Sequence, residues 1–300
     1  MTMHLPGPVC VAACCAPACG LPSSPSAQPR TRLAAAATLG WGALLVWALA
    51  LPAASAAQPA GASSVTRGGV SSGLADMSAA LQAMQREDTR NPGMLWVADG
   101  QARWQQRAGA ADKSCAHCHG EASTSMRGVA ARYPAFDTAL GKPLTLAQRL
   151  AHCRTRHQQA SPLPAEGEAA LGLLAYVALQ SRGQAVAVQD DPRLLPWRQQ
   201  GQRLYQQRMG QLDLSCAQCH DQRAGQRLGG TLIPQGHANG YPLYRLEWQG
   251  LGSLQRRIRN CTSGVRAEAF ADDADELTAL ELYLQQRAAG LVIETPAVRP

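Results

Sequence analysis

The pentapeptide Cys-x-x-Cys-His occurs twice in this chain of 300 residues and constrains its fold more than any other feature. In this motif two thiols add to the two vinyl groups of one porphyrin, and the adjacent imidazole binds the iron. A zinc site would have to join motifs that lie 101 residues apart, and a thioredoxin-like redox pair needs a βαβ pattern that the sequence lacks. We therefore expect two covalent haem c groups, bound by Cys115, Cys118, His119, Cys216, Cys219 and His220.

The N-terminal part of the sequence has the features of a signal peptide, as attachment of haem outside the cytoplasm requires. Arg30 and Arg32 precede an uncharged apolar run over 33–51, and an Ala-Ser-Ala tripeptide ends at residue 56. We expect residues 1–56 to form an N-terminal extension and signal peptide that is removed. The mature protein would then be periplasmic, without a membrane span. An uncleaved membrane anchor over the same run is the alternative.

The charge of the chain limits its classes of partner. The formal net charge is +7, and two of the positive charges belong to the leader arginines. This modest excess is spread along the chain, so no nucleic-acid partner is expected. It suits a secreted protein that meets anions or acidic partners. The length that follows residue 56 fits two domains.

An internal repeat runs through the mature sequence. Up to the motifs the offset is 101, as in the pairs Trp96/Trp197, Gly100/Gly201, Arg107/Arg208 and Ser114/Ser215. Downstream the offset is 108, as in the pairs Tyr133/Tyr241, Arg149/Arg257, Cys153/Cys261 and Glu168/Glu276. We therefore expect an all-α fold of two tandem cytochrome c-type domains from an internal duplication, over 57–185 and 186–300, each with one covalent haem.

Helical spacing and a scarcity of β-branched residues predict seven helices, near 79–89, 98–107, 145–156, 166–181, 197–208, 251–260 and 273–287. The last of these has an apolar stripe that we expect to pack against haem or core, formed by Leu277, Leu280, Tyr283 and Leu284. Gly290 is expected to stop this helix. The stretch 183–196, with one glycine and two prolines, is the expected linker between the domains.

Each iron needs a second axial ligand, and the methionines are badly placed to supply the His/Met pair common in electron-transfer cytochromes. The last methionine, Met209, precedes the second motif, and Met126 follows the first motif by only seven residues. Cysteines remain at matching repeat positions on predicted helices. We therefore expect His/Cys ligation of the irons, by His119 and Cys153 and by His220 and Cys261. A thiolate stabilises Fe(III), so both reduction potentials should be low.

Other arrangements of these groups stay open. Cys153 and Cys261 could instead form a disulfide, which the compartment allows. Other candidate ligands are His152, His157 and His237. We expect His152 to point off the same helix face as Cys153, and His237 to be a surface or partner-binding residue in a Gly-rich loop.

The segment around Cys261 is rich in arginine. Arg257 precedes Cys261 by four residues, so the two share a helix face. A guanidinium one turn from a thiolate lowers the pKa of the thiol and offers an anion a forked donor. Further positive charge comes from Arg256, Arg259 and Arg266. An ordinary solvated, arginine-rich helix is the alternative, because Arg149 and Cys153 have the same spacing in the first half.

The run Arg257-x-x-x-Cys261-x-x-Gly264-x-Arg266-Ala267-Glu268, both haem motifs and both distal cysteines resemble the dihaem branch of the SoxA family. This family provides the dihaem cytochrome subunit of an L-cysteine S-thiosulfotransferase, and the resemblance covers essentially the whole mature chain. It implies that Cys261 is a cysteine persulfide that ligates the second haem and forms the reaction intermediate, and that Arg257 binds the substrate. It also implies a first haem bound by Cys115, Cys118, His119 and Cys153.

The same resemblance implies partners. The substrate would be thiosulfate, and the acceptor would be the cysteine of the sulfur carrier SoxY in its complex with SoxZ. A monohaem cytochrome of the SoxX type would form the heterodimer, and a soluble cytochrome c would take the electrons. The rival functions are a thiosulfate dehydrogenase that releases tetrathionate, a plain dihaem electron carrier and a dihaem peroxidase.

Overall fold

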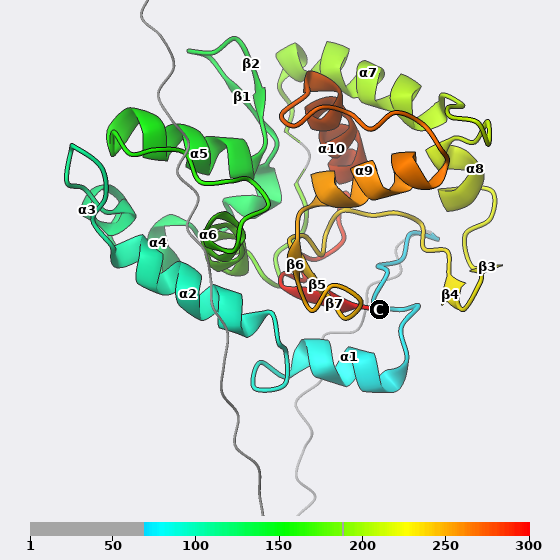
Figure 1. The fold of residues 1–300 in the computed structure, drawn as a ribbon, viewed down its shortest axis with the longest axis horizontal. Coiled ribbons are helices and arrows are strands. Elements are labelled where there is room, and N and C mark those ends of the chain that lie inside the picture. Colours follow the sequence, from blue (N-terminus) through cyan, green and yellow to red (C-terminus); the bar gives the residue numbers. More distant parts are fainter. Residues whose placement is uncertain (1–68, 188) are drawn as a thin grey trace, which may run out of the picture. The chain divides into compact units, whose positions relative to one another are not determined.

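The computed structural model describes residues 69–187 and 189–300, whose helices and strands are drawn in Figure 1. The leader expected over 1–56 lies outside these residues. All of the described residues belong to one compact unit, Gln58–Pro300. Within the described ranges, no helix is both long enough and apolar enough to cross a membrane.

The seven predicted helices are confirmed, with ends shifted by a few residues. They are α1 (Ala79–Arg86), α2 (Met94–Gln105), α5 (Leu146–His157), α6 (Glu168–Leu179), α7 (Leu195–Gln206), α9 (Leu254–Gly264) and α10 (Asp275–Arg287). Short helices that the sequence did not predict are α3 (Cys115–His119), α4 (Ala122–Ser125) and α8 (Cys216–His220). They hold too few turns for a periodic pattern. Two 3-10 turns are η1 (Ala130–Arg132) and η2 (Pro192–Leu194).

Small sheets correct the expectation of an all-α fold. An antiparallel pair joins β1 (Ala135–Asp137) to β2 (Lys142–Leu144), and another joins β3 (Arg227–Leu228) to β4 (Thr231–Leu232). A third sheet has the order β6-β5-β7 and consists of β5 (Leu243–Arg245), β6 (Gly250–Gly252) and β7 (Ala297–Arg299). β5 runs antiparallel to β6 and parallel to β7. Strands of two or three residues leave no alternating pattern for the sequence to reveal.

Each repeat is built on a close crossing of two helices at a glycine. α2 crosses α6 at Gly100, where an added Cβ would lie 2.0 Å from the carbonyl oxygen of Gly172. α7 crosses α10 at Gly201, where an added Cβ would lie 2.1 Å from the carbonyl oxygen of Ala279. Only glycine lets the helix backbones approach this closely.

These crossings also correct the alignment of the repeats. Gly172 contacts Gly100 as Ala279 contacts Gly201, and Tyr176 and Tyr283 contact the same two glycines. The last helices of the two repeats are therefore related by an offset of 107. The expected match of Glu168 with Glu276 is therefore one residue out of register. Glu168 corresponds to Asp275, and each is the first residue of its helix.

Two separate apolar clusters form the cores of the repeats. Trp104 and Tyr176 are buried in the first cluster, and Cys115 of the first motif packs against it. Tyr205 is buried in the second cluster, and Cys216 packs against it. The apolar stripe predicted on the last helix is confirmed, because its residues are buried in this second cluster or pack against it, namely Leu277, Leu280, Leu284 and Tyr283.

The segment before the first repeat packs against the second repeat. α1 lies beside β7 (Figure 1), and the side-chain amide of Asn91 donates a hydrogen bond to the carbonyl oxygen of Pro296 at 2.8 Å. The expected linker also contacts the second repeat, since the N–H of Val186 donates to the carbonyl oxygen of Leu291 at 2.8 Å. The two repeats are therefore tied together at both ends of the first one. The domain boundary expected at 185/186 stays a prediction.

Candidate functional site

Each Cys-x-x-Cys-His motif forms a single helical turn that begins at a serine. The Oγ of Ser114 accepts a hydrogen bond from the N–H of His117 at 3.0 Å. The Oγ of Ser215 accepts one from the N–H of Gln218 at 3.3 Å. Serine at the N-cap fixes where such a turn begins. Because the motif thiols are three residues apart, each pair lies on one side of its turn.

A buried aromatic residue anchors the end of each turn. The indole N–H of Trp104 donates to the carbonyl oxygen of Gly120 at 2.9 Å, directly after the first motif. In the same place in the second repeat, the hydroxyl of Tyr205 donates to a carboxylate oxygen of Asp221 at 2.9 Å. The ring of Trp104 also lies 5.9 Å from the ring of His119. The motif histidine is thus held against the core of its repeat.

The imidazole of His220 is oriented to bind a metal. Its Nδ1 lies 2.7 Å from the carbonyl oxygen of Pro234. A carbonyl oxygen only accepts hydrogen bonds, so Nδ1 donates a proton to it and Nε2 keeps a free lone pair. Burial lowers the pKa of His220, although the Pro234 carbonyl acts in the opposite direction. The neutral imidazole with a free Nε2 is the form that binds haem iron.

The distal cysteines lie near the thiols of their own motifs. Burial, followed by the nearby Cys153 on α5, raises the pKa of Cys115. Burial, followed by the nearby Cys261 on α9, raises the pKa of Cys216 to about 11. Both distal cysteines are free thiols in the described structure, so the alternative disulfide between them is not formed. Each repeat therefore gathers three thiols and one imidazole, a donor set that fits a covalent haem with His/Cys ligation.

The other candidate ligands lie away from these clusters. His152 directly precedes Cys153 on α5, and successive helical residues point about 100° apart. The two side chains therefore leave different faces of the helix, not the shared face that we had expected. The Nδ1 of His152 is buried and has no hydrogen-bond partner in the described residues. His237 was expected at the surface, but its Nδ1 lies 2.9 Å from the carbonyl oxygen of Ser71 and the ring is half-buried. His157 is exposed at the end of α5.

In the first repeat, the arginine one turn before the distal cysteine is neutralised. Arg149 forms an ion pair with Asp137 on β1, and its Nε–H donates to the hydroxyl of Tyr133 at 3.3 Å. The N–H of Leu140 and the Arg149 guanidinium lower the pKa of Asp137. Arg149 is thereby paired with a carboxylate and a hydroxyl of its own repeat.

In the second repeat, the equivalent arginine has no acidic partner. Arg257 holds the place of Arg149 on α9, but Arg245 on β5 holds the place of the aspartate. No ion pair of Arg257 is formed within the described part of the chain, whereas its neighbour Arg259 pairs with Asp272 at 3.0 Å. The guanidinium next to Cys261 is therefore free to meet an anion.

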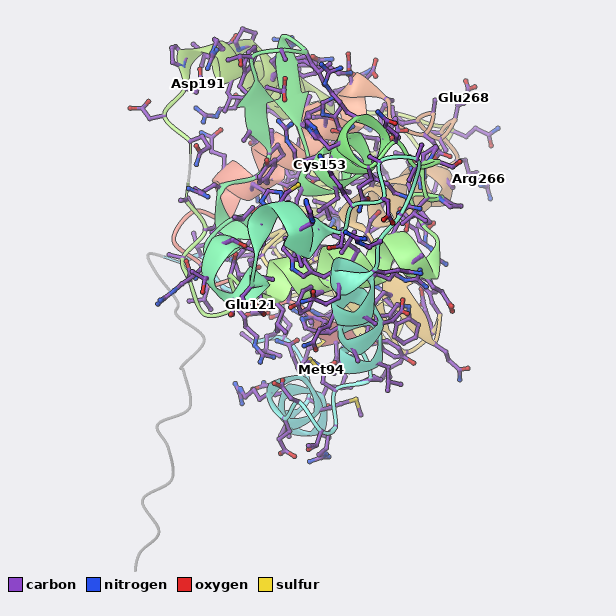
Figure 2. All side chains as sticks on the ribbon, turned by 90° about the vertical axis from the view of Figure 1, so that its left-hand side faces the viewer. Met94, Glu121, Cys153, Asp191, Arg266 and Glu268 are labelled. Carbon is purple, nitrogen blue, oxygen red and sulfur yellow. The ribbon has the colours of Figure 1, made fainter. Side chains whose placement is uncertain are left out.

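The remaining arginines near Cys261 face other surroundings. Arg256 stacks on the ring of Trp248, 4.1 Å from its centroid. Arg266 has a positive φ of 58° directly after α9. Figure 2 shows Arg266 and Glu268 on the outer side of the molecule, well separated from Cys153. The arginine-rich segment is therefore divided between Arg257, which is one helical turn from Cys261, and residues that pair or stack elsewhere.

Two segments of the chain, 99–186 and 200–293, match the family model described as SoxA/TsdA, cytochrome c domain. The chain belongs to this family. Cytochrome c domains bind haem c covalently, and the two matched segments correspond to the two repeats of the fold.

Curated relatives and a solved structure agree with this membership. The chain is 40% identical over 210 residues to the L-cysteine S-thiosulfotransferase subunit SoxA of Pseudaminobacter salicylatoxidans, which covers 70% of this chain and 73% of that protein. It is 35% identical over 216 residues to the same subunit of Paracoccus pantotrophus, and this match covers 72% of this chain and 74% of that protein. The crystal structure of SoxXA from P. pantotrophus matches with a TM-score of 0.74 at 34% identity, over 77% of this chain and 87% of that chain.

Two residues that lie close to the arginine-rich helix were not singled out in the sequence. Arg245 and Trp248 precede the arginine-rich helix, and the guanidinium of Arg245 lies 5.1 Å from the ring centroid of Trp248. The offset of 108 pairs Arg245 with Asp137, so the repeat could have drawn attention to Arg245. The importance of Arg245 depends on the contact between Asp137 and Arg149, which forms only in the folded chain.

A cavity of about 420 Å³ lies between the two repeats of this family member. Residues of α5, α6, α9 and α10 line it, including Leu174 and Glu281. Burial raises the pKa of Glu281 to about 7, and the side chain of Gln255 partly offsets this. None of the motif cysteines and histidines lines the cavity, so it is separate from both motifs.

Proposed function

We propose that this chain is the SoxA-type subunit of an L-cysteine S-thiosulfotransferase, which couples thiosulfate to the cysteine of a sulfur carrier protein in the periplasm. Family membership and the identity with SoxA subunits support this function. The observation that carries it is the difference between two equivalent arginines. Arg149 is neutralised by Asp137, whereas Arg257 has no acidic partner in the described residues. An electron carrier without a substrate would have no use for that difference.

Two covalent haem c groups, one in each repeat, complete the proposal. The first would be bound by Cys115, Cys118, His119 and Cys153, and the second by Cys216, Cys219, His220 and Cys261. Support comes from the donor set that each repeat gathers and from the free Nε2 of His220. When bound, haem accepts one electron at a time, and an axial thiolate keeps its reduction potential low.

Arg257 would bind the substrate. Thiosulfate is a dianion whose sulfonate oxygens suit the forked N–H donors of a guanidinium. Arg257 and Cys261 are one helical turn apart on α9, so a sulfonate held by Arg257 leaves the outer sulfur of thiosulfate near residue 261. The arginine therefore binds and orients the substrate for attack at sulfur.

Cys261 would form the sulfur–sulfur bond of the intermediate. As a persulfide anion it would bond to the outer sulfur of thiosulfate, a two-electron oxidation for which c-type haems, when bound, would be the one-electron acceptors. The thiolate of the carrier then attacks that outer sulfur, and the Cys261 persulfide is released unchanged. The carrier keeps Cys–S–S–SO₃⁻, and the proton of its thiol goes to solvent. Atoms and charges balance for one thiosulfate and two electrons.

The proposed partners follow from the same relatives. The matched crystal structure is that of SoxXA, so a monohaem cytochrome of the SoxX type would form a heterodimer with this chain. The carrier would be of the SoxY–SoxZ type, and a soluble cytochrome c would remove the electrons. This assembly agrees with the signal peptide expected in residues 1–56.

Reconstitution tests the proposal. Haem-loaded protein with its SoxX-type partner is mixed with thiosulfate, carrier and oxidised cytochrome c, and the carrier is weighed by mass spectrometry. We expect the carrier to gain one thiosulfate group, and Cys261→Ala to slow this at least about a thousandfold. Ser263→Ala, at an exposed position on the same helix, is the control and should retain coupling.

Two outcomes contradict the proposal. One is unchanged coupling in Cys261→Ala when both haems remain loaded. The other is rapid formation of tetrathionate by the native protein with no mass gain on the carrier, which would favour the thiosulfate dehydrogenase alternative.

A further inference from the structure

Arg245 occupies the strand position in the second repeat that Asp137 occupies in the first. The strand pairs β1–β2 and β5–β6 have the same register, with Asp137 opposite Lys142 and Arg245 opposite Gly250. Alternate residues of a strand point to opposite faces. The side chain of Arg245 therefore starts from the same place, and in the same direction, as the carboxylate that reaches Arg149 in the first repeat.

The guanidinium of Arg245 is enclosed but incompletely bonded. Its side chain is 12% exposed, and its Nε is buried without a hydrogen-bond partner in the described residues. Its ion pair in the described residues is with Glu247, whose carboxylate lies 3.3 Å from Nε but is itself 52% exposed, so this pairing is screened by solvent. Burial, followed by the charge of Arg257, lowers the pKa of Arg245. An enclosed cation with free N–H groups is stabilised when it binds an anion.

Trp248 holds this guanidinium in position. An added Cβ on Gly252 would lie 2.3 Å from the indole ring, so the ring packs directly against the backbone of β6. Arg245 lies 5.1 Å and Arg256 lies 4.1 Å from the centroid of that ring. Cation–π contact restricts a side chain that is otherwise flexible, which lowers the entropic cost of binding an anion.

We propose that Arg245 is a second anion-binding residue of the Cys261 site, where it holds the sulfonate of thiosulfate together with Arg257. The choice of thiosulfate rests on the proposed function. The two guanidinium groups come from a strand and a helix, so they can donate to different oxygens of one tetrahedral dianion. The first repeat cannot bind such an anion, because Asp137 repels it and already neutralises Arg149.

Equilibrium binding tests the inference without turnover. The oxidised, haem-loaded protein is titrated with thiosulfate in a calorimeter, with sodium chloride at the same ionic strength as the reference. We expect Arg245→Gln to weaken binding about ten- to a hundredfold, as the loss of one charge-assisted hydrogen-bonding group implies. Arg245→Lys should recover part of the affinity. Arg245→Asp should weaken binding most, because its carboxylate would neutralise Arg257 as Asp137 neutralises Arg149.

Arg193→Gln is the matched control. Arg193 also stacks on an aromatic ring, 4.3 Å from the centroid of Phe136, and it pairs with Asp191. Its replacement should leave the affinity for thiosulfate within about twofold of the native value, since an exposed ion pair contributes little.

Three results overturn the inference. The first is native affinity in Arg245→Gln while Arg257→Gln binds weakly. The second is equal weakening by Arg245→Lys and Arg245→Gln together with a lower melting temperature in both, which would indicate a structural role. The third is no measurable binding of thiosulfate by the native protein. If the native protein binds thiosulfate through Arg245 but adds nothing to the carrier, the proposed function fails and the anion site stands.

Discussion

The two repeats share a helical frame and differ in the charge around the distal cysteine. Both repeats cross two long helices at a glycine, begin their motif turn at a serine, and carry an arginine and a distal cysteine four residues apart on one helix. The first repeat closes its arginine with a carboxylate, whereas the second puts an arginine at that position. The two repeats have thus kept the same helical frame. The difference lies in one strand residue. Asp137 makes a neutral pair with Arg149, whereas Arg245 adds a second positive charge near Arg257.

The proximal side differs as well. The Nδ1 of His220 bonds to the carbonyl oxygen of Pro234, and Gly236 packs so closely that an added Cβ would lie 3.0 Å from the imidazole. His119 instead lies against the ring of Trp104. A hydrogen bond to a carbonyl raises the basicity of an imidazole ligand and fixes its plane. The repeat whose arginine lacks a carboxylate partner in the described residues therefore also has the more tightly oriented histidine.

The shared frame predicts the largest effects on stability. Gly100→Ala and Gly201→Ala would each force a Cβ to within about 2 Å of a carbonyl oxygen on the crossing helix. Separation of the helices would lose the packing of both cores. We expect each substitution to lower the free energy of unfolding by about 3 kcal/mol or more. Chemical denaturation of the haem-loaded protein, followed by circular dichroism, measures this.

Gly230→Ala is the control for these glycines. No atom lies within 4 Å of an added Cβ at Gly230, and its φ is not positive. Its effect should stay within about 0.5 kcal/mol. A stable Gly201→Ala beside an unstable Gly100→Ala would mean that the second crossing is not equivalent to the first.

The sequence predicted the frame better than the site. Long helices and the distal cysteines followed from periodic spacing and from the repeat. The turn at Cys115–His119 and strands of two or three residues were too short to produce a pattern. The single offset of 108 misaligned the last helices, because α10 begins 14 residues after Cys261, whereas α6 begins 15 residues after Cys153. Asp137 and Arg245 were visible as unlike residues, but their role depends on contacts across a hairpin and a helix.

A carboxyl group of the second repeat lines the cavity between the repeats, and its titration should make the stability of the protein depend on pH. Glu281 on α10 and Leu174 on α6 are equivalent at the offset of 107, and both line the cavity. The pKa of Glu281 is raised from 4.5 to about 7 on folding. Between those values the folded state keeps a proton that the unfolded chain loses, so stability falls as pH rises. The fall should reach at most about 3 kcal/mol.

Glu281→Gln should remove that fall, and denaturant midpoints measured from pH 4.5 to 8 would reveal it. Leu174→Glu should add a second fall of the same sign, since it places a carboxyl in the same cavity. Gln286→Glu, at an exposed position of α10, is the control and should leave the slope unchanged. A native-like slope in Glu281→Gln would show that this carboxyl ionises freely in the folded protein.

The two equivalent arginines provide the most direct test of the comparison. Arg257→Gln should raise KM for thiosulfate about ten- to a hundredfold, because a charge-assisted contact is lost, and it should leave unfolding nearly unchanged, because no carboxylate is orphaned. Arg149→Gln should do the reverse. It should leave KM unchanged and lower the free energy of unfolding, because Asp137 loses its ion-pair partner. The lowered pKa of Asp137 means that this contribution is present above pH 3.8 and disappears on further acidification. The stability difference between native protein and Arg149→Gln should therefore shrink at low pH. An equal rise of KM in both variants would contradict the assignment of substrate binding to the second repeat.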